Sequence, residues 1–286
     1  MPLFRAFRAF RRFSRLVDGV PVSPVGLNPG EEGTGLAATP VVQILSGLAW
    51  LDDVAALPDV VRASMAEAHR HWLLSKPRSY FEGLLTGATG LLIGALVRGE
   101  LAGFAALVAS EDFASARRLG QVTYPDPEGR ANAAYGQGRV GVVQSLCVRR
   151  DYLGRALAGS IIRAAVEESR RQGRGHIFAQ MADQNALSWM RFLGEGFGLV
   201  GTWETDCRRF LMRWFPPEER AAMLADAGLA DRRLYRKDYG QIPALVADAR
   251  HQVEAGRIVL LHDRPEEPGA LHVVFCRAPS KGARSR

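Results

Sequence analysis

The chain is poor in cysteine, in long apolar runs and in acidic residues at its two ends. Its three cysteines, Cys147, Cys207 and Cys276, are widely spaced and odd in number, which fits neither a disulfide framework nor a zinc site. The long apolar stretch at residues 90–97 is far shorter than the roughly 18 residues that a membrane-spanning helix needs. We therefore expect a reducing, cytoplasmic location and no bound metal, and the sequence predicts no transmembrane segment.

The formal net charge of +7 comes from the two ends of the chain. Among 286 residues, 37 are Lys or Arg and 30 are Asp or Glu. Residues 1–17 contain five arginines and residues 277–286 contain four basic residues, and neither segment has an acid. Without these nine residues, 28 basic side chains face 30 acidic ones, so the remainder is slightly acidic. The charge pattern therefore gives no reason to expect a specific nucleic-acid partner.

Residues 1–17 have the pattern of a basic amphipathic helix. Phenylalanines such as Phe7, Phe10 and Phe13 share one face, and the arginines occupy the opposite face. Such a helix suits a membrane surface, an acidic protein partner or packing on its own domain, and these alternatives stay open. Residues 18–40 contain five glycines and four prolines, which predicts a linker.

Hydrophobic patterning predicts alternating strands and helices from residue 41 onward. Strands are expected at 41–45, 91–97, 101–108, 140–148, 173–181, 199–204 and 207–214, and helices at 52–72, from 154 onward and at 185–193. Gly99 favours a tight hairpin turn between two of the strands. The segment 111–139 is either a loop over a binding site or an insertion without function. The pattern of residues 216–286 predicts an α+β appendage with two helices, a hairpin and a basic tail.

One strand runs into a helix through small residues, and this turn is the main candidate binding site. The segment is Tyr152-Leu-Gly-Arg-Ala-Leu-Ala-Gly-Ser160. The first N–H groups of a helix lack intrahelical partners and carry the positive end of its dipole, so they can bind a phosphate. Arg149, Arg150 and Arg155 are close enough in sequence to meet a charged nucleotide. Close helix packing is the alternative reason for such small residues.

Two segments together resemble the signature motifs of a known family. Residues 145–160 and Asn185-Ala-Leu-Ser-Trp-Met-Arg-Phe-Leu-Gly-Glu-Gly-Phe197 resemble those of the GNAT superfamily of acyl-CoA-dependent N-acyltransferases. The resemblance covers residues 41–215. It implies an α+β fold with a central, mixed but mostly antiparallel twisted sheet flanked by helices, with the 216–286 segment as an appendage. It also implies acetyl-CoA or another acyl-CoA as co-substrate.

The resemblance further implies which residues contact coenzyme A. They are Leu146, Cys147, Val148, Leu153, Gly154, Arg155, Ala156, Leu157, Ala158 and Gly159, with Asn185 beside the pantetheine arm. The match has departures. Leu153 stands where the pyrophosphate turn usually has Arg or Gln, and Ala156 stands where it has its central glycine. Phe192 occupies the position of a tyrosine that often protonates the departing thiolate. Gln144 or Ser145 occupies the position where the family often has an acidic residue that acts as a base.

No catalytic acid or base follows from the sequence, and the catalytic residues stay unassigned. Asp183, Glu204 and Asp206 are the nearest acids and are expected to be cap or turn residues, while Cys147 is expected to be a buried strand cysteine rather than a nucleophile. The leading hypothesis is transfer of an acetyl or other short acyl group from coenzyme A to a primary amine of a small molecule or protein. The alternatives are an acyl-carrier-protein donor and a non-catalytic acyl-CoA-binding module.

Overall fold

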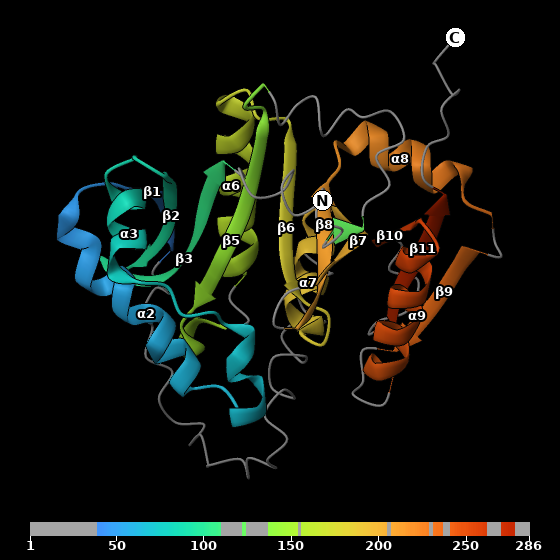
Figure 1. Cartoon of the computed structure of the whole chain (residues 1–286), viewed down its shortest axis with the longest axis horizontal. Coiled ribbons are helices and arrows are strands. Elements are labelled where there is room, and N and C mark those ends of the chain that lie inside the picture. The colour runs from blue at the N-terminus through green and yellow to red at the C-terminus, as the bar shows by residue number, and fades with distance from the viewer. Residues whose placement is uncertain are drawn as a thin grey trace.

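A single sheet runs through the part of the chain that the computed structural model describes (Figure 1). The described residues are 39–109, 122–123, 137–153, 156–204, 207–228, 231–236, 241–261 and 270–277. The predicted helix at residues 1–17, nearly all of the predicted linker and most of the 111–139 segment lie outside them.

The strands of this sheet are almost all antiparallel. They are β1 Val41–Leu45, β2 Gly90–Val97, β3 Glu100–Ala109, β4 Val122–Thr123, β5 Val140–Val148, β6 His176–Ala182, β7 Phe197–Glu204, β8 Arg208–Trp214, β9 Arg232–Arg236, β10 Arg257–Leu261 and β11 Ala270–Arg277. Their order is β1-β2-β3-β5-β6-β8-β7-β10-β11-β9, and β4 pairs with β7. Among these described strands only β5 and β6 pair in parallel. The expected mixed, mostly antiparallel sheet is confirmed.

Helices cover both faces of the sheet. They are η1 Leu48–Trp50, α2 Leu51–Ala63, η2 Glu67–Trp72, α3 Arg78–Leu85, η3 Arg150–Tyr152, α6 Leu157–Arg171, α7 Ala186–Gly194, α8 Pro217–Asp226 and α9 Ile242–Glu254, where η marks a 3-10 helix. Helices α6, α7 and α9 pack on one face, while α2 and α3 cover the other face near β1 and α8 covers it near β11. No helix of the described residues has the length and apolar character needed to cross a membrane.

The predicted helix at 52–72 is wrong as a continuous element. Helix α2 ends at Ala63, and residues 67–72 form the separate η2. At the end of α2 the Ser64 N–H donates to the Val61 carbonyl at 3.0 Å and the Met65 N–H to the Arg62 carbonyl at 3.1 Å, the three-residue spacing of a tightened last turn. Pro58 lies buried within α2.

The hairpin between β2 and β3 confirms the predicted tight turn. Val97 pairs with Glu100, and the two residues between them both have positive φ, 55° for Arg98 and 83° for Gly99. Positive φ at both central positions characterises the type I′ turn, whose twist matches that of paired strands. The glycine is therefore required by backbone conformation.

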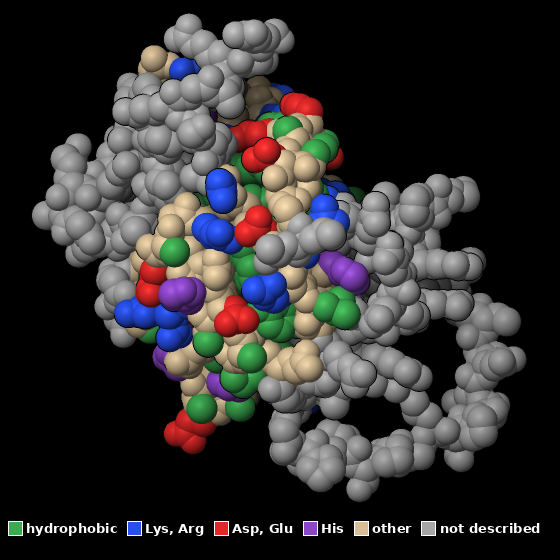
Figure 2. All heavy atoms as spheres, turned by 90° about the vertical axis from the view of Figure 1, so that its right-hand side faces the viewer, with side chains coloured by type: hydrophobic (Ala, Val, Ile, Leu, Met, Phe, Trp, Pro, Cys, Tyr) green, Lys and Arg blue, Asp and Glu red, His purple; other side chains and the backbone are tan. Residues whose placement is uncertain are grey.

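The strands of the C-terminal appendage continue the sheet of the preceding domain. Strand β10 pairs with β7 at Val259 and Leu199, β11 pairs with β10, and β9 pairs with β11. Val259 and Phe275 belong to the same hydrophobic core as α6 and α7. Figure 2 views the molecule from this side, where acidic and basic side chains of the described residues are interspersed.

Candidate functional site

Strands β5 and β6 separate part-way along their length. Their parallel pairing runs from Val140 and His176 to Val143 and Ala179, although β5 continues to Val148 and β6 to Ala182. A hollow of about 220 Å³, called the cleft below, lies where the strands part. Its lining includes Gln144, Ser145 and Leu146 of β5, Gln180 and Met181 of β6, and Phe192 of α7.

A β-bulge in β5 lies at this cleft. Opposite Ala105 of β3, the strand has the two residues Ser145 and Leu146, and the φ of Ser145 is 54°. A non-glycine residue with positive φ is uncommon and turns the following peptide group away from the regular ladder. Because pairing with β6 has already ended at Val143, the bulge presents backbone groups that β6 does not engage.

A tyrosine that sequence reasoning missed contacts the bulge. The hydroxyl of Tyr80, on α3, accepts a hydrogen bond from Gln144 Nε2 at 3.0 Å. Burial raises the pKa of Tyr80, while hydrogen bonds with the side chains of Ser145 and Gln144 oppose part of that rise. The ammonium of Lys76, which lines the cleft, lies 5.2 Å from the centroid of the tyrosine ring. Tyr80 and Gln144 are 64 residues apart in sequence, so no local pattern could have indicated their hydrogen bond.

In the predicted coenzyme turn, the backbone of Ala156 has the conformation that favours glycine. Ala156 immediately precedes α6 with φ of 64°, a left-handed conformation that favours glycine. Helix α6 therefore begins at Leu157, later than the predicted position 154. No side chain caps its N-terminus and its first turn contains no acid. Gly154 and Arg155 lie outside the described residues.

The structure brings only some of the predicted coenzyme residues to the cleft. Leu146 and Asn185 line it, and Asn185 also caps α7 by accepting a hydrogen bond from the Ser188 N–H at 3.3 Å. Leu157 is in the core, and a Cβ at Gly159 would lie too close to Glu195 Oε1, so a larger residue there would require the Glu195 carboxylate to move. The remaining positions divide between surface and interior: Leu153 is exposed, Val148 and Ala158 are half-buried, and Cys147 is buried.

Phe192 and Cys147 are both in apolar surroundings. Phe192 lines the cleft and packs edge-on against Phe197, with ring centroids 5.0 Å apart. Burial raises the pKa of Cys147 to about 12, so this residue is a neutral thiol near pH 7. Arg149, near the coenzyme turn, forms ion pairs with Asp151 at 3.3 Å and Glu100 at 3.7 Å.

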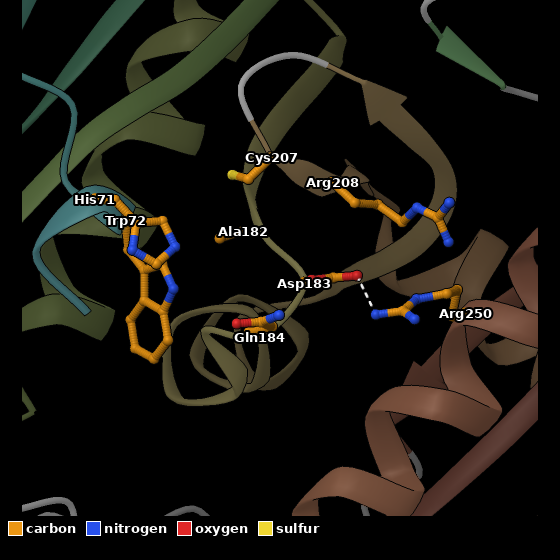
Figure 3. A pocket seen from close by; sticks show the side chains of 8 residues that line it. All are labelled: His71, Trp72, Ala182, Asp183, Gln184, Cys207, Arg208 and Arg250. Atoms are coloured by element: carbon orange, nitrogen blue, oxygen red, sulfur yellow. Dashed lines mark hydrogen bonds and ion pairs between the residues drawn. The ribbon is translucent and has the colours of Figure 1, made fainter. Parts of the chain in front are cut away.

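A second hollow of about 300 Å³, called the side recess below, adjoins the cleft (Figure 3). It is lined by His71 and Trp72 of η2, Ala182 to Gln184 at the end of β6, Cys207 and Arg208 at the start of β8, and Arg250 of α9. Trp72 lines both hollows.

Asp183 is a buried carboxylate in the side recess. Its Oδ2 is 2.5 Å from Arg250 Nη2, as the dashed line in Figure 3 marks. Its carbonyl oxygen accepts a hydrogen bond from Trp189 Nε1 at 2.9 Å. The sequence predicted a cap or turn role for Asp183 but gave no sign of this partner 67 residues away. The Glu204 side chain and Asp206 lie outside the described residues.

Comparisons with known proteins give a family match for the part of the chain that contains the cleft. Residues 57–194 match the acetyltransferase (GNAT) family model, a range that contains Tyr80, β5, β6 and α7. No curated protein matches the sequence.

Three similar solved structures are acetyltransferases. A GNAT-family acetyltransferase from Streptococcus agalactiae has 14% identity and a TM-score of 0.46, with 62% of this chain and 95% of that chain covered. The ribosomal-protein-S18-alanine N-acetyltransferase from Escherichia coli has 13% identity and a TM-score of 0.43, with 62% and 93% covered. The ribosomal-protein-alanine N-acetyltransferase from Brucella melitensis has 15% identity and a TM-score of 0.44, with 62% and 99% covered.

The family match thus identifies residues 57–194 as a domain of the acetyltransferase (GNAT) family.

Proposed function

We propose that this protein is an N-acetyltransferase that transfers the acetyl group of acetyl-CoA to a primary amine. The observation that carries the proposal is the parting of β5 and β6 beyond Val143, with a bulge at Ser145 on the open side. A thioester placed there would meet backbone N–H groups rather than a paired strand.

The bulge supports the first chemical step. The amine nitrogen attacks the thioester carbonyl carbon, and negative charge develops on the carbonyl oxygen. Fixed N–H donors aimed at such an oxygen stabilise the transition state, typically by about 3 kcal/mol for one donor. The backbone at Ser145 and Leu146 is the proposed source of these donors. Cleavage of the C–S bond then releases coenzyme A as a thiolate.

Tyr80 is the proposed proton donor to that thiolate. The Tyr80 oxygen accepts the hydrogen bond that Gln144 Nε2 donates at 3.0 Å, and the interaction with the Ser145 side chain also favours the phenolate form. The hydroxyl hydrogen of Tyr80 is then left to give away. Because burial raises the Tyr80 pKa, the phenol stays protonated near pH 7. The proton released by the attacking amine returns to Tyr80 through water, which completes the proton balance.

The start of α6 is the proposed site of the coenzyme pyrophosphate. The first N–H groups of a helix favour a phosphate, and this helix has no side-chain cap to compete for them. Leu153 to Gly159 would surround the pyrophosphate, and Leu146, Cys147, Val148 and Asn185 would lie along the pantetheine arm. The left-handed Ala156 supports this assignment because the family turn has a glycine there.

Thermal shift and thiol release together test the proposal. Acetyl-CoA at millimolar concentration should raise the melting temperature by mass action, and an added alkylamine should cause release of free thiol. A shift without thiol release across a panel of amines would favour the non-catalytic module. Transfer from an acyl-carrier protein but not from acetyl-CoA would favour the carrier-dependent enzyme. All three functions would be excluded if acetyl-CoA caused no shift and neither acetyl-CoA nor an acyl-carrier protein supported transfer to an amine.

Residues 1–17 are proposed to attach an otherwise cytoplasmic enzyme to an anionic membrane surface or an acidic protein. The arginine and phenylalanine faces of this segment carry the proposal. A chain that starts at residue 39 should lose co-sedimentation with phosphatidylserine vesicles yet retain thiol release. If the shortened chain sediments as well as the full chain, the segment is not the anchor.

A further inference from the structure

We propose that the side recess binds an anionic group of the acceptor, so that the preferred substrate is an amine with a carboxylate several bonds from its nitrogen. The proposal rests on the proposed acetyltransferase function. It gives the C-terminal appendage a part in substrate selection, since Arg250 belongs to α9.

The described lining of the cleft and side recess has an excess of positive charge. Its basic residues are Lys76, Arg208, Arg209 and Arg250, and its one carboxylate is that of Asp183. This carboxylate is already neutralised by Arg250 at 2.5 Å. On the face viewed in Figure 2, by contrast, charges of both signs are interspersed. Such an excess favours an anionic ligand and disfavours a diamine.

Arg250 retains hydrogen-bonding capacity after pairing with Asp183. Its Nε–H is buried and has no hydrogen-bond partner among the described residues. Buried donors are normally satisfied, so an oxygen from a ligand or water is expected there. Arg208, the other arginine of the recess, is paired with Glu254 at 3.2 Å, but both side chains are more than 40% exposed. Exposed pairs contribute little to stability, so a ligand carboxylate can exchange for Glu254.

The recess is distinct from the region proposed for the coenzyme phosphates. No described residue from 149 to 160 lines it. It is instead joined to the cleft through Trp72 and along β6, where Gln180 lines the cleft and Asp183 lines the recess. The three-residue step from Gln180 to Asp183 spans roughly 10 Å, and the recess arginines extend over part of this distance. An amine in the cleft and a carboxylate in the recess must therefore belong to a molecule with a spacer.

A series of amines of equal length provides the test. Aminohexanoate with a terminal amine, hexylamine and hexanediamine differ in the group at the far end, which is anionic, neutral or cationic. Thiol release from acetyl-CoA gives kcat/KM for each, and we expect the value for aminohexanoate to exceed that for hexylamine about tenfold or more, as expected for a charge-assisted hydrogen bond. Hexanediamine should be the poorest of the three.

Two arginine variants locate the effect. Arg208→Gln should reduce the aminohexanoate-to-hexylamine ratio to near one. Removal of the charge at Arg250 would leave the buried Asp183 carboxylate unpaired, so we choose Arg250→Lys. This substitution keeps the charge and removes the Nε donor. It should also lower the aminohexanoate-to-hexylamine ratio. Arg257→Gln is the matched control, because Arg257 is another appendage arginine in an ion pair, 2.6 Å from Asp231, and does not line the recess.

The outcomes separate this inference from the proposed function. Equal kcat/KM for aminohexanoate and hexylamine, or a preference that survives Arg208→Gln, would overturn the anion site and leave the acetyltransferase intact. Without turnover of any amine, a larger increase in melting temperature with aminohexanoate than with hexylamine would still support the site, and the absence of that difference would overturn it. A missing melting shift with acetyl-CoA counts against the proposed function alone.

Discussion

At the scale of single residues, Tyr80 offers the hydroxyl that position 192 of α7 lacks. Tyr80→Phe keeps the ring and removes the proton donor, so we expect kcat for thiol release to fall about 100-fold. The raised pKa of Tyr80 sets the sign of the pH dependence. The acid form is required, so wild-type activity should persist up to the usual phenol value of about 10 and decline above it.

Tyr235→Phe is the matched control for this prediction. Burial and a hydrogen bond to Asp248 also raise the pKa of Tyr235, but this residue lies on β9 and lines neither hollow. It should leave kcat unchanged. The alkaline decline should disappear in Tyr80→Phe, a change that a merely structural role would not produce. A kcat equal to that of wild type would remove Tyr80 from the mechanism.

Ala156 carries a backbone conformation that suits glycine better. Ala156→Gly should increase the free energy of unfolding by about 1 kcal/mol, because an L side chain in the left-handed region is strained. Urea denaturation measures this change. Ala158→Gly, two residues later within α6, should have the opposite sign, because glycine disfavours helix. Destabilisation by both substitutions would show that Ala156 is not strained.

At the scale of elements, Gly103 allows β3 to lie close to the end of β5 that leads into the coenzyme turn. A Cβ at this position would be 2.7 Å from the Cys147 carbonyl oxygen, a backbone atom that cannot move away alone. Gly103→Ala should therefore cost about 1–3 kcal/mol of stability and reduce the melting shift produced by acetyl-CoA.

Gly175→Ala supplies the comparison for Gly103→Ala. A Cβ at Gly175 would have no heavy atom within 4 Å, and its φ is not in the positive region. Its acetyl-CoA shift should equal that of wild type. If Gly103→Ala also retains the full shift, the end of β5 does not govern coenzyme binding.

Local patterns predicted the elements whose signals are local. The β2–β3 hairpin, β5 and α7 follow from the pattern of apolar residues and a turn glycine within a few residues. Strand β9 was missed because Arg232–Arg236 is mostly charged and resembles a solvated loop. The bulge at Ser145 was not predicted, since it depends on how β5 pairs with β3 rather than on β5 alone.

At the scale of the whole molecule, the family match stops at residue 194 but the sheet does not. A chain that ends at Phe215 would expose the edge of β7 that pairs with β10, together with the apolar surface that Val259 covers. A Cβ at Gly198 of β7 would contact Leu260 of β10 at 2.6 Å, which shows how closely the two strands pack. We expect this shortened chain to aggregate and to lose cooperative unfolding.

A chain that ends at Arg277 is the control, because it lacks the basic tail but retains β11. It should unfold cooperatively and release thiol like the full chain. A monomeric, cooperatively unfolding 1–215 fragment would show instead that the appendage is dispensable for folding.

Topology decides how much of the site a sequence can reveal. The resemblance at residues 145–160 and 185–197 could be seen in the sequence because each motif is contiguous in the chain. Tyr80 and Arg250 could not, since each reaches its partner across more than 60 residues. The sequence thus predicts where a coenzyme binds better than what the enzyme acts upon.

Trp72 lines both hollows and can therefore act as an intrinsic fluorescent probe of ligand binding. The imidazole of His69 stacks on its indole with centroids 4.0 Å apart and an interplanar angle of 12°. Acceptors that enter either hollow change the surroundings of this fluorophore, so its emission should shift in wavelength or intensity on titration. Trp72→Phe should abolish the signal, and Trp214→Phe, which removes an indole outside both linings, should preserve it.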